Sequence, residues 1–142
     1  MLVIWHGVRA EAQAMSGNVA AASQELLALR AARDATPQPA PGARTDGNEL
    51  AVAAIADGVA RGRIAEAQGN ADAALRHYRA AEAIEANLPY FEPPLWPTPV
   101  AVLAGQLHLR LGDRATAAAD FQRALVQRPN NSLAAAGLVA AA

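Results

Sequence analysis

The chain has 142 residues, of which 53% are hydrophobic and only 4% aromatic, with alanine the dominant residue. Its twelve basic residues, all arginine, and thirteen acidic residues give a formal net charge of -1. This balance argues against a nucleic-acid-binding surface, which normally needs clustered excess positive charge. The absence of cysteine excludes disulfides and thiolate metal sites.

The composition predicts one tightly packed all-α domain over residues 1–142. Alanine has the best helix propensity, and its small side chain lets helix axes approach closely. No apolar run is long enough to span a bilayer, and the first five residues lack the basic lead and apolar core of a signal peptide. We therefore expect a soluble, cytoplasmic protein without membrane contact, unless an upstream segment carries a different targeting signal.

The first helical hairpin is predicted over about residues 2–33. Apolar residues recur near helical spacing as far as Met15. Gly17 can end the first helix in the left-handed conformation, and Asn18 can cap the second. The second helix places three apolar side chains on one face, Ala22, Leu26 and Leu29.

A proline-rich loop is predicted over residues 34–48, where the sequence reads DATPQPAPGARTDGN. Its three prolines and two glycines break helices, and its polar residues offer no core. We interpret it as an insertion tolerated between hairpins rather than as a binding loop. The second hairpin follows over about residues 49–87, with Asn48 as its cap and Gly69-Asn70 as its turn.

A second insertion, LPYFEPPLWPTP, covers residues 88–99. Its prolines prevent a helix from passing through it. It holds Tyr90, Phe91 and Trp96, which are half of the six aromatic residues in the chain. Because exposing three large rings is costly, we expect this segment to pack against the helices.

The third hairpin is predicted over about residues 99–128. We expect Thr98 to cap its first helix, with Pro99 in the first turn. Gly112 and Asp113 form the hairpin turn, and an alanine-rich final helix is expected over about residues 132–141. The chain is thus predicted to contain about seven helices and two proline-rich insertions.

The surroundings of the three glycine turns resemble the tetratricopeptide repeat (TPR) family. In that family a small residue precedes a Gly-Asp or Gly-Asn turn, and alanine, an aromatic residue, alanine and a closing proline follow. The third hairpin supplies Gly105, Gly112, Asp113, Ala117, Phe121, Ala124 and Pro129. The second supplies Gly62, Gly69, Asn70, Ala74, Tyr78 and Ala81, with Ala86 in place of the proline. The first keeps the glycine turn and the small-residue spacing, with Leu26 in place of the aromatic residue.

The resemblance implies antiparallel hairpins stacked as a short right-handed superhelix. Small residues let the helices of a hairpin cross closely, and the aromatic residue fills the gap to the next hairpin. Two features depart from the family. Its repeats usually recur every 34 residues, whereas the turn glycines here lie 52 and 43 residues apart. The bulky aromatic residue common early in the first helix is also absent, since His6, Gly58 and Ala101 stand there.

Proteins of this family bind extended peptides or helices along a concave face lined by the first helices, so the resemblance implies a peptide-binding groove. Arginine can hold a carboxylate with two hydrogen bonds, which makes Arg63 and Arg110 candidates for gripping an acidic partner. Alternatively, they are solvated or pair with Glu66 and Glu11 and contribute little. The candidate groove residues are Glu11, Val59, Arg63, Glu66, Val102, Gln106, Leu109 and Arg110, with Ile4, Gly7 and Met15 beside them.

A second candidate site is a pocket in the 88–99 insertion formed by Tyr90, Glu92 and Trp96. Aromatic walls with one carboxylate can accept a cationic or planar group. Alternatively, these rings fill the gap between the second and third hairpins, which is the commoner role of large aromatic residues.

Catalytic and cofactor motifs are not evident in the sequence. The three histidines, His6, His77 and His108, show no metal-ligand spacing. There is no glycine-rich phosphate loop, nucleophile elbow or recognisable serine triad motif. We therefore expect no enzymatic activity, no cofactor and no metal site.

The sequence favours a non-enzymatic scaffold that binds a protein or peptide partner through its groove. One alternative is a small-ligand or regulatory domain that uses residues 88–99. Another is a C-terminal fragment that packs on the rest of a longer protein, because LPYFEPPLWP resembles a segment before the last hairpin of longer bacterial TPR proteins. The ends of the chain, LVIW and SLAAAGLVAAA, are apolar, whereas repeat arrays normally carry polar caps. We expect self-association or upstream repeats to cover them.

Overall fold

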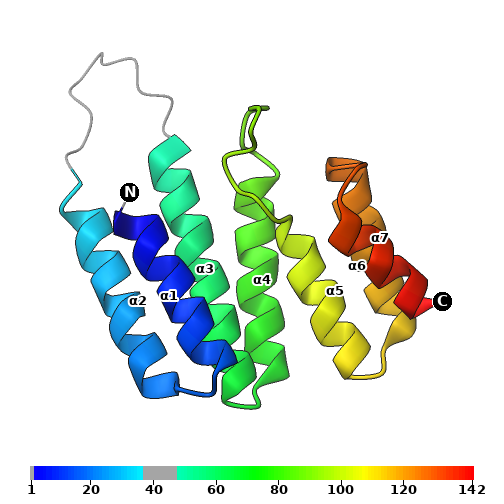
Figure 1. Ribbon diagram of the computed structural model, residues 1–142, viewed down its shortest axis with the longest axis horizontal. Helices are drawn as coiled ribbons and strands as arrows, with labels where there is room; N and C mark the ends of the chain where they lie inside the picture. The colour runs from blue at the N-terminus through cyan, green and yellow to red at the C-terminus, as the bar shows by residue number, and fades with distance from the viewer. Residues whose placement is uncertain (1, 37–47) are drawn as a thin grey trace. The chain divides into compact units, whose positions relative to one another are not determined.

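The computed structural model describes residues 2–36 and 48–142. Over these residues the chain is all-α, with seven helices in antiparallel pairs (Figure 1). Their bounds are α1 (Leu2–Met15), α2 (Val19–Asp34), α3 (Asn48–Ala67), α4 (Ala71–Glu85), α5 (Val100–Arg110), α6 (Arg114–Gln127) and α7 (Ser132–Ala141). The predicted helices are therefore confirmed. The largest difference at a hairpin end is in the second hairpin, which is predicted to end at Asn87 and ends at Glu85. Most of the predicted first loop, residues 37–47, lies outside the described residues.

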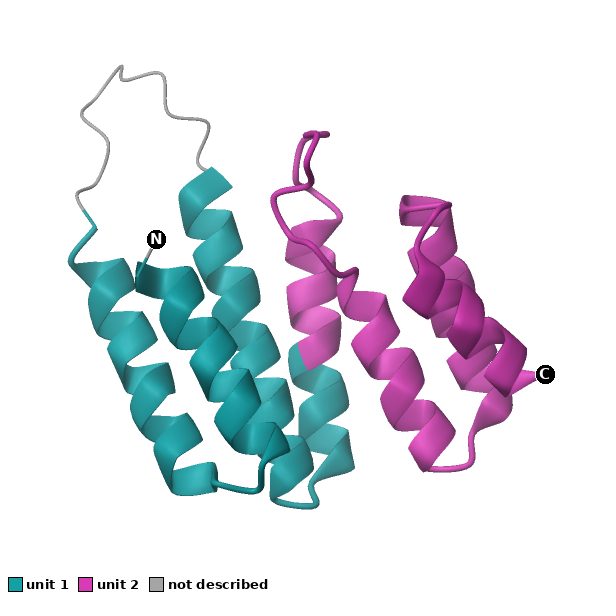
Figure 2. Cartoon of the chain, in the orientation of Figure 1, with its two compact units in different colours: residues 1–77 teal, residues 78–142 magenta. Residues whose placement is uncertain are grey.

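The helices belong to two compact units, residues 1–77 and 78–142, with the boundary inside α4 (Figure 2). In the first unit, α1, α2 and α3 pack on one another. In the second unit, α5, α6 and α7 do the same. Among the described residues, no helix combines the length and apolar character needed to cross a bilayer.

The three hairpin turns share one local conformation. Their glycines, Gly17, Gly69 and Gly112, have φ angles of 77°, 75° and 83°. Glycine adopts this left-handed region without the penalty that a Cβ atom imposes. The next residue in each turn accepts a hydrogen bond from the backbone N–H three residues on, at 3.2 Å for Asn18, 3.0 Å for Asn70 and 3.0 Å for Asp113. The predicted pairing of a glycine stop with an Asn or Asp cap is confirmed.

Equivalent positions around the three turns are buried. Seven residues before the glycines stand Ala10, Gly62 and Gly105. Five residues after them stand Ala22, Ala74 and Ala117, and nine residues after them stand Leu26, Tyr78 and Phe121. The sequence repeat is therefore a repeat of core positions, in which small residues bring helices together and a larger residue fills the space between them.

Phe121 is the central residue of the second unit. Its ring has no exposed surface and belongs to a cluster of small apolar residues from α5, α6 and α7. A Cβ atom added at Gly105 would lie 2.8 Å from the ring, and one added at Gly137 would lie closer still. Glycine at both positions therefore lets α5 and α7 approach this ring. The aromatic residue fills space against α5 of its own hairpin as well as against the following helix.

The start of α5 differs from the prediction. Pro99, not Thr98, is the residue that precedes the helix, and no local side chain caps it. Instead the Val100 N–H donates a hydrogen bond to Glu85 Oε2 at 2.8 Å. A carboxylate from the end of α4 thus replaces the local cap, a contact that no local capping pattern encodes.

We predict that Gly112→Ala lowers the free energy of unfolding by about 1 kcal/mol, because an L-residue is strained in the left-handed region. No atom lies within 4 Å of a Cβ added there, so the penalty is conformational rather than steric. Gly112→Asn should cost less, since asparagine tolerates this conformation. Urea unfolding of the three proteins measures the effect, and equal losses in both variants would contradict the strain explanation.

Candidate functional site

The candidate groove residues divide between the two units. Glu11, Val59, Arg63 and Glu66 belong to the first, and Val102, Gln106, Leu109 and Arg110 belong to the second. Val59 and Val102 have no exposed surface, so these two side chains form part of the cores and present nothing to a peptide. Gly7 is also buried, and a Cβ added there would lie 3.2 Å from the Cβ of Ala56. These three positions are on the packed faces of their helices.

Arg63 is paired within the first unit. Its Nη1 donates to Glu66 Oε1 at 3.4 Å, while its Nε lies 3.8 Å from Glu11 Oε2, too far for a hydrogen bond. Burial raises the pKa of Glu11, and the nearby Arg63 charge opposes that shift. The guanidinium thus pairs with the two carboxylates that the sequence offered as the alternative to a peptide partner.

Helix α1 carries an apolar face that solvent reaches. Trp5, Val8 and Met15 are 55%, 57% and 72% exposed. With Ala12, which is also exposed, they follow the i, i+3, i+7, i+10 spacing of one helix face. The packed side of α1 consists of small residues, Gly7, Ala10 and Ala14. The helix therefore packs through its small residues and presents its large ones, and we call these four exposed residues the α1 face.

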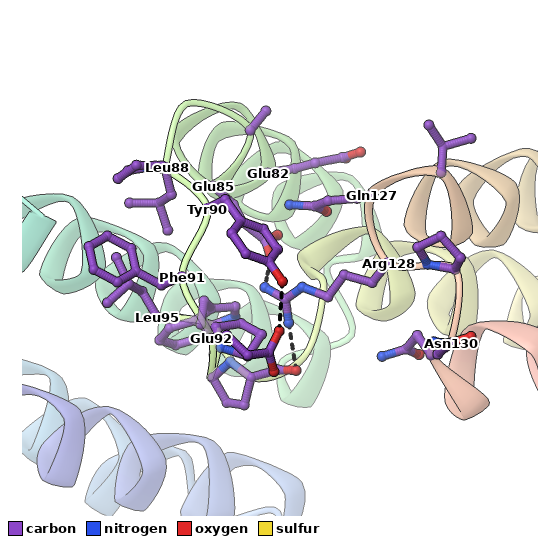
Figure 3. A pocket seen from close by; sticks show the side chains of 18 of the residues that line it. Glu82, Glu85, Leu88, Tyr90, Phe91, Glu92, Leu95, Gln127, Arg128 and Asn130 are labelled. Carbon is purple, nitrogen blue, oxygen red and sulfur yellow. Dashed lines mark hydrogen bonds and ion pairs between the residues drawn. The ribbon is translucent and has the colours of Figure 1, made fainter.

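A pocket of about 870 Å³ lies in the second unit, between residues 85–97 and the stretch from the end of α6 to Asn131 (Figure 3). Tyr90, Glu92 and Trp96, the three residues proposed from the sequence, all line it. The rest of the wall includes prolines, apolar side chains such as Leu88 and Leu95, and charged side chains from α4, from α6 and from Arg128. The pocket is thus built where the second insertion meets the helices.

The three rings of the insertion differ in burial. Trp96 is 8% exposed, Phe91 is 40% exposed and Tyr90 is 88% exposed. The expectation that all three pack against the helices is therefore wrong for Tyr90 and holds best for Trp96. The Tyr90 hydroxyl donates to Glu92 Oε2 at 2.9 Å, which satisfies the polar end of the ring at the surface.

Glu85 and Arg128 fasten the insertion to the helices. Arg128 Nη1 donates to the Pro97 carbonyl at 2.7 Å, and Nη2 donates to Glu85 Oε1 at 3.2 Å. The other oxygen of Glu85 accepts the Val100 N–H, so both oxygens of this buried carboxylate have partners. We call these contacts the Glu85–Arg128 clasp. It fixes the end of the insertion to α4 and to the residue after α6.

A second buried carboxylate, Asp120 on α6, joins three helices. It accepts hydrogen bonds from Arg79 at 2.6 Å and Arg123 at 2.5 Å, and lies 2.8 Å from His108 Nδ1. His108, on α5, therefore points toward α6 of its own hairpin. The network itself was missed, although an aspartate on the alanine-rich face of a helix was a signal that it needed partners.

Comparison of the chain with protein-family models, with curated proteins and with solved structures finds no match. Within residues 2–36 and 48–142, no three or more His, Asp or Glu side chains gather in a way that could hold a metal ion. Two features are therefore candidates for a binding site: the α1 face in the first unit, and the pocket in the second.

We predict that the wild type loses stability relative to Glu85→Gln as the pH rises above about 4.5, the ordinary value for a glutamate. Burial raises the pKa of Glu85, and the Val100 N–H and Arg128 only partly oppose this. The folded state therefore binds the proton more tightly than the unfolded state, so a rising pH favours unfolding. Glutamine resembles the neutral acid and lacks this dependence.

Urea unfolding of both proteins, from below that pH to neutral pH, measures the difference. Any hydrogen bond that the glutamine side chain cannot make changes the free energy of unfolding of the variant by a constant amount. That offset between the wild type and Glu85→Gln does not depend on pH. If the wild type instead becomes more stable relative to Glu85→Gln as the pH rises, pairing to Arg128 outweighs the cost of burial.

Proposed function

We propose that this chain is a non-enzymatic helical-repeat protein of the TPR kind that binds other polypeptides. Its hairpins would stack as a short right-handed superhelix interrupted by two proline-rich insertions. Support for the repeat comes from the turn conformation and the buried small residues, which recur around Gly17, Gly69 and Gly112. Such repeats serve as scaffolds because each hairpin leaves helix faces available to a neighbour.

The observation that carries the binding proposal is the α1 face. Apolar side chains at this spacing are the ones that pack against another helix. Contiguous apolar surface on a soluble protein marks an interaction site. Burying Trp5, Val8 and Met15 against a partner would remove most of their apolar area from water, at about 25 cal/mol per Å².

The partner that this face fits is a helix with an apolar stripe of its own. A second copy of the chain offers one in its own α1 face, and a preceding repeat of a longer protein would offer another. We propose self-association through the α1 face. A peptide groove along the first helices remains a further proposal for the same function, with Val59 and Val102 removed from its lining and with Arg63 already paired to Glu66.

We predict that the wild type self-associates and that Val8→Glu/Met15→Glu sediments as a 14.7 kDa monomer. Glutamate has a good helix propensity, so α1 should stay folded while its apolar stripe is interrupted. The matched control is Leu27→Glu, which changes a 64% exposed leucine on α2 outside the α1 face. Sedimentation velocity over a concentration series measures all three proteins, with circular dichroism to confirm helicity.

The control should behave as the wild type does. A wild type that stays monomeric at the highest concentration overturns self-association. A double variant that associates as strongly as the wild type shows that another surface is responsible.

A further inference from the structure

The pocket of the second unit contains one carboxylate that no arginine of residues 2–36 and 48–142 pairs with. Three glutamates line the pocket, Glu82, Glu85 and Glu92. Glu82 pairs with Arg79 at 2.8 Å and Arg123 at 2.9 Å, and Glu85 pairs with Arg128. In the described part of the chain, Glu92 receives one hydrogen bond, from the Tyr90 hydroxyl, and has no ion pair. Its negative charge is available to a ligand.

Aromatic surface lies next to this carboxylate. Tyr90 and Phe91 expose much of their rings and Trp96 lines the pocket with little exposure. Figure 3 shows the Tyr90 hydroxyl meeting the Glu92 carboxylate, so the ring and the charge belong to one local arrangement. A cation beside a carboxylate and over a ring face gains from both.

We propose that this pocket binds an arginine side chain inserted by a partner polypeptide beside Glu92 and Tyr90. A guanidinium is planar, so it can form two hydrogen bonds to a carboxylate and also stack on an aromatic ring. A lysine ammonium offers a compact charge without the flat surface, and it fits this arrangement less well.

The frame of the pocket is fixed before the ligand arrives. The Glu85–Arg128 clasp holds the end of the insertion through the 2.7 Å contact to the Pro97 carbonyl. A preformed frame lowers the entropic cost of binding. Arg128 and Arg123, which also line the pocket, are paired to Glu85 and Glu82 rather than to Glu92.

The size of the pocket indicates that the arginine belongs to a polypeptide. About 870 Å³ is near the upper end of small-molecule pockets and exceeds what one side chain fills. Pro89, Pro94, Pro97 and Pro129 add rigid apolar surface on which the residues flanking an arginine can lie. The pocket lies wholly in the second unit, so this inference does not depend on the α1 face.

The test uses Trp96 as the reporter. The chain has two tryptophans, and Trp5→Phe leaves Trp96 as the single one. Its fluorescence is followed while a blocked pentapeptide, Gly-Pro-Arg-Pro-Gly, is added. Parallel titrations use the same peptide with lysine or citrulline in place of arginine, and blocked arginine alone. Citrulline keeps the shape of arginine without its charge.

The arginine peptide should give a saturable change, with weaker binding of the lysine peptide and none of the citrulline peptide. Glu92→Gln should weaken binding about tenfold, the size of one charge-assisted hydrogen bond. The matched control, Glu49→Gln, removes the same charge at an exposed residue of α3 and should leave the affinity unchanged.

Four results would overturn the inference. One is the absence of any saturable change with the arginine peptide. Equal binding of the citrulline peptide is the second, and an affinity that Glu92→Gln leaves unchanged is the third; either would remove the role of the charge. The fourth is binding of blocked arginine but not of the peptide, which would assign the pocket to a small molecule instead.

Discussion

The packing of Phe121 against glycine is the constraint on which the second unit depends. Its ring occupies the space that side chains at Gly105 and Gly137 would otherwise fill, so α5 and α7 can approach α6. Protein interiors are close-packed, and a change of one methyl group at such a contact is felt by all three helices. The position of α6 then determines where Arg128 emerges after its last turn. The pocket is therefore a consequence of helix packing as much as of the insertion that forms one of its walls.

The Glu85–Arg128 clasp converts this packing into a defined wall for the pocket. It also carries an electrostatic cost, because burial raises the pKa of Glu85 despite its two partners. A buried pair of this kind often adds little to stability while restricting the geometry of what it joins. Here it joins the Pro97 carbonyl and the first turn of α5 to the end of α4. Among the described residues, Glu92 lies outside these pairings, and this is the basis of the cationic ligand that we propose for the pocket.

The fold was largely predictable from the sequence, because its signals are local and periodic. The turns at Gly17, Gly69 and Gly112 and the alanines that follow them could be placed from spacing alone, and the structure buries those alanines. The contacts of Glu85 with Arg128 and of Asp120 with Arg79 and His108 could not be predicted, because these partners lie on other elements of the chain. Val59 and Val102 show that the sequence also failed to predict which way a helix packs. The resemblance to the TPR family placed them in the lining of a groove, whereas the structure buries both side chains.

A double-mutant cycle between Gly105 and Phe121 tests the packing constraint most directly. Alanine has a helix propensity about 1 kcal/mol better than glycine, so without a steric conflict Gly105→Ala should stabilise α5. Against Phe121 we predict a loss instead, of about 1–3 kcal/mol, as for other overpacked cores. In a Phe121→Leu background, where the ring is gone, the same substitution should become neutral or stabilising, which the cycle measures as a coupling energy. Equal effects of Gly105→Ala in both backgrounds would contradict the proposed role of Phe121.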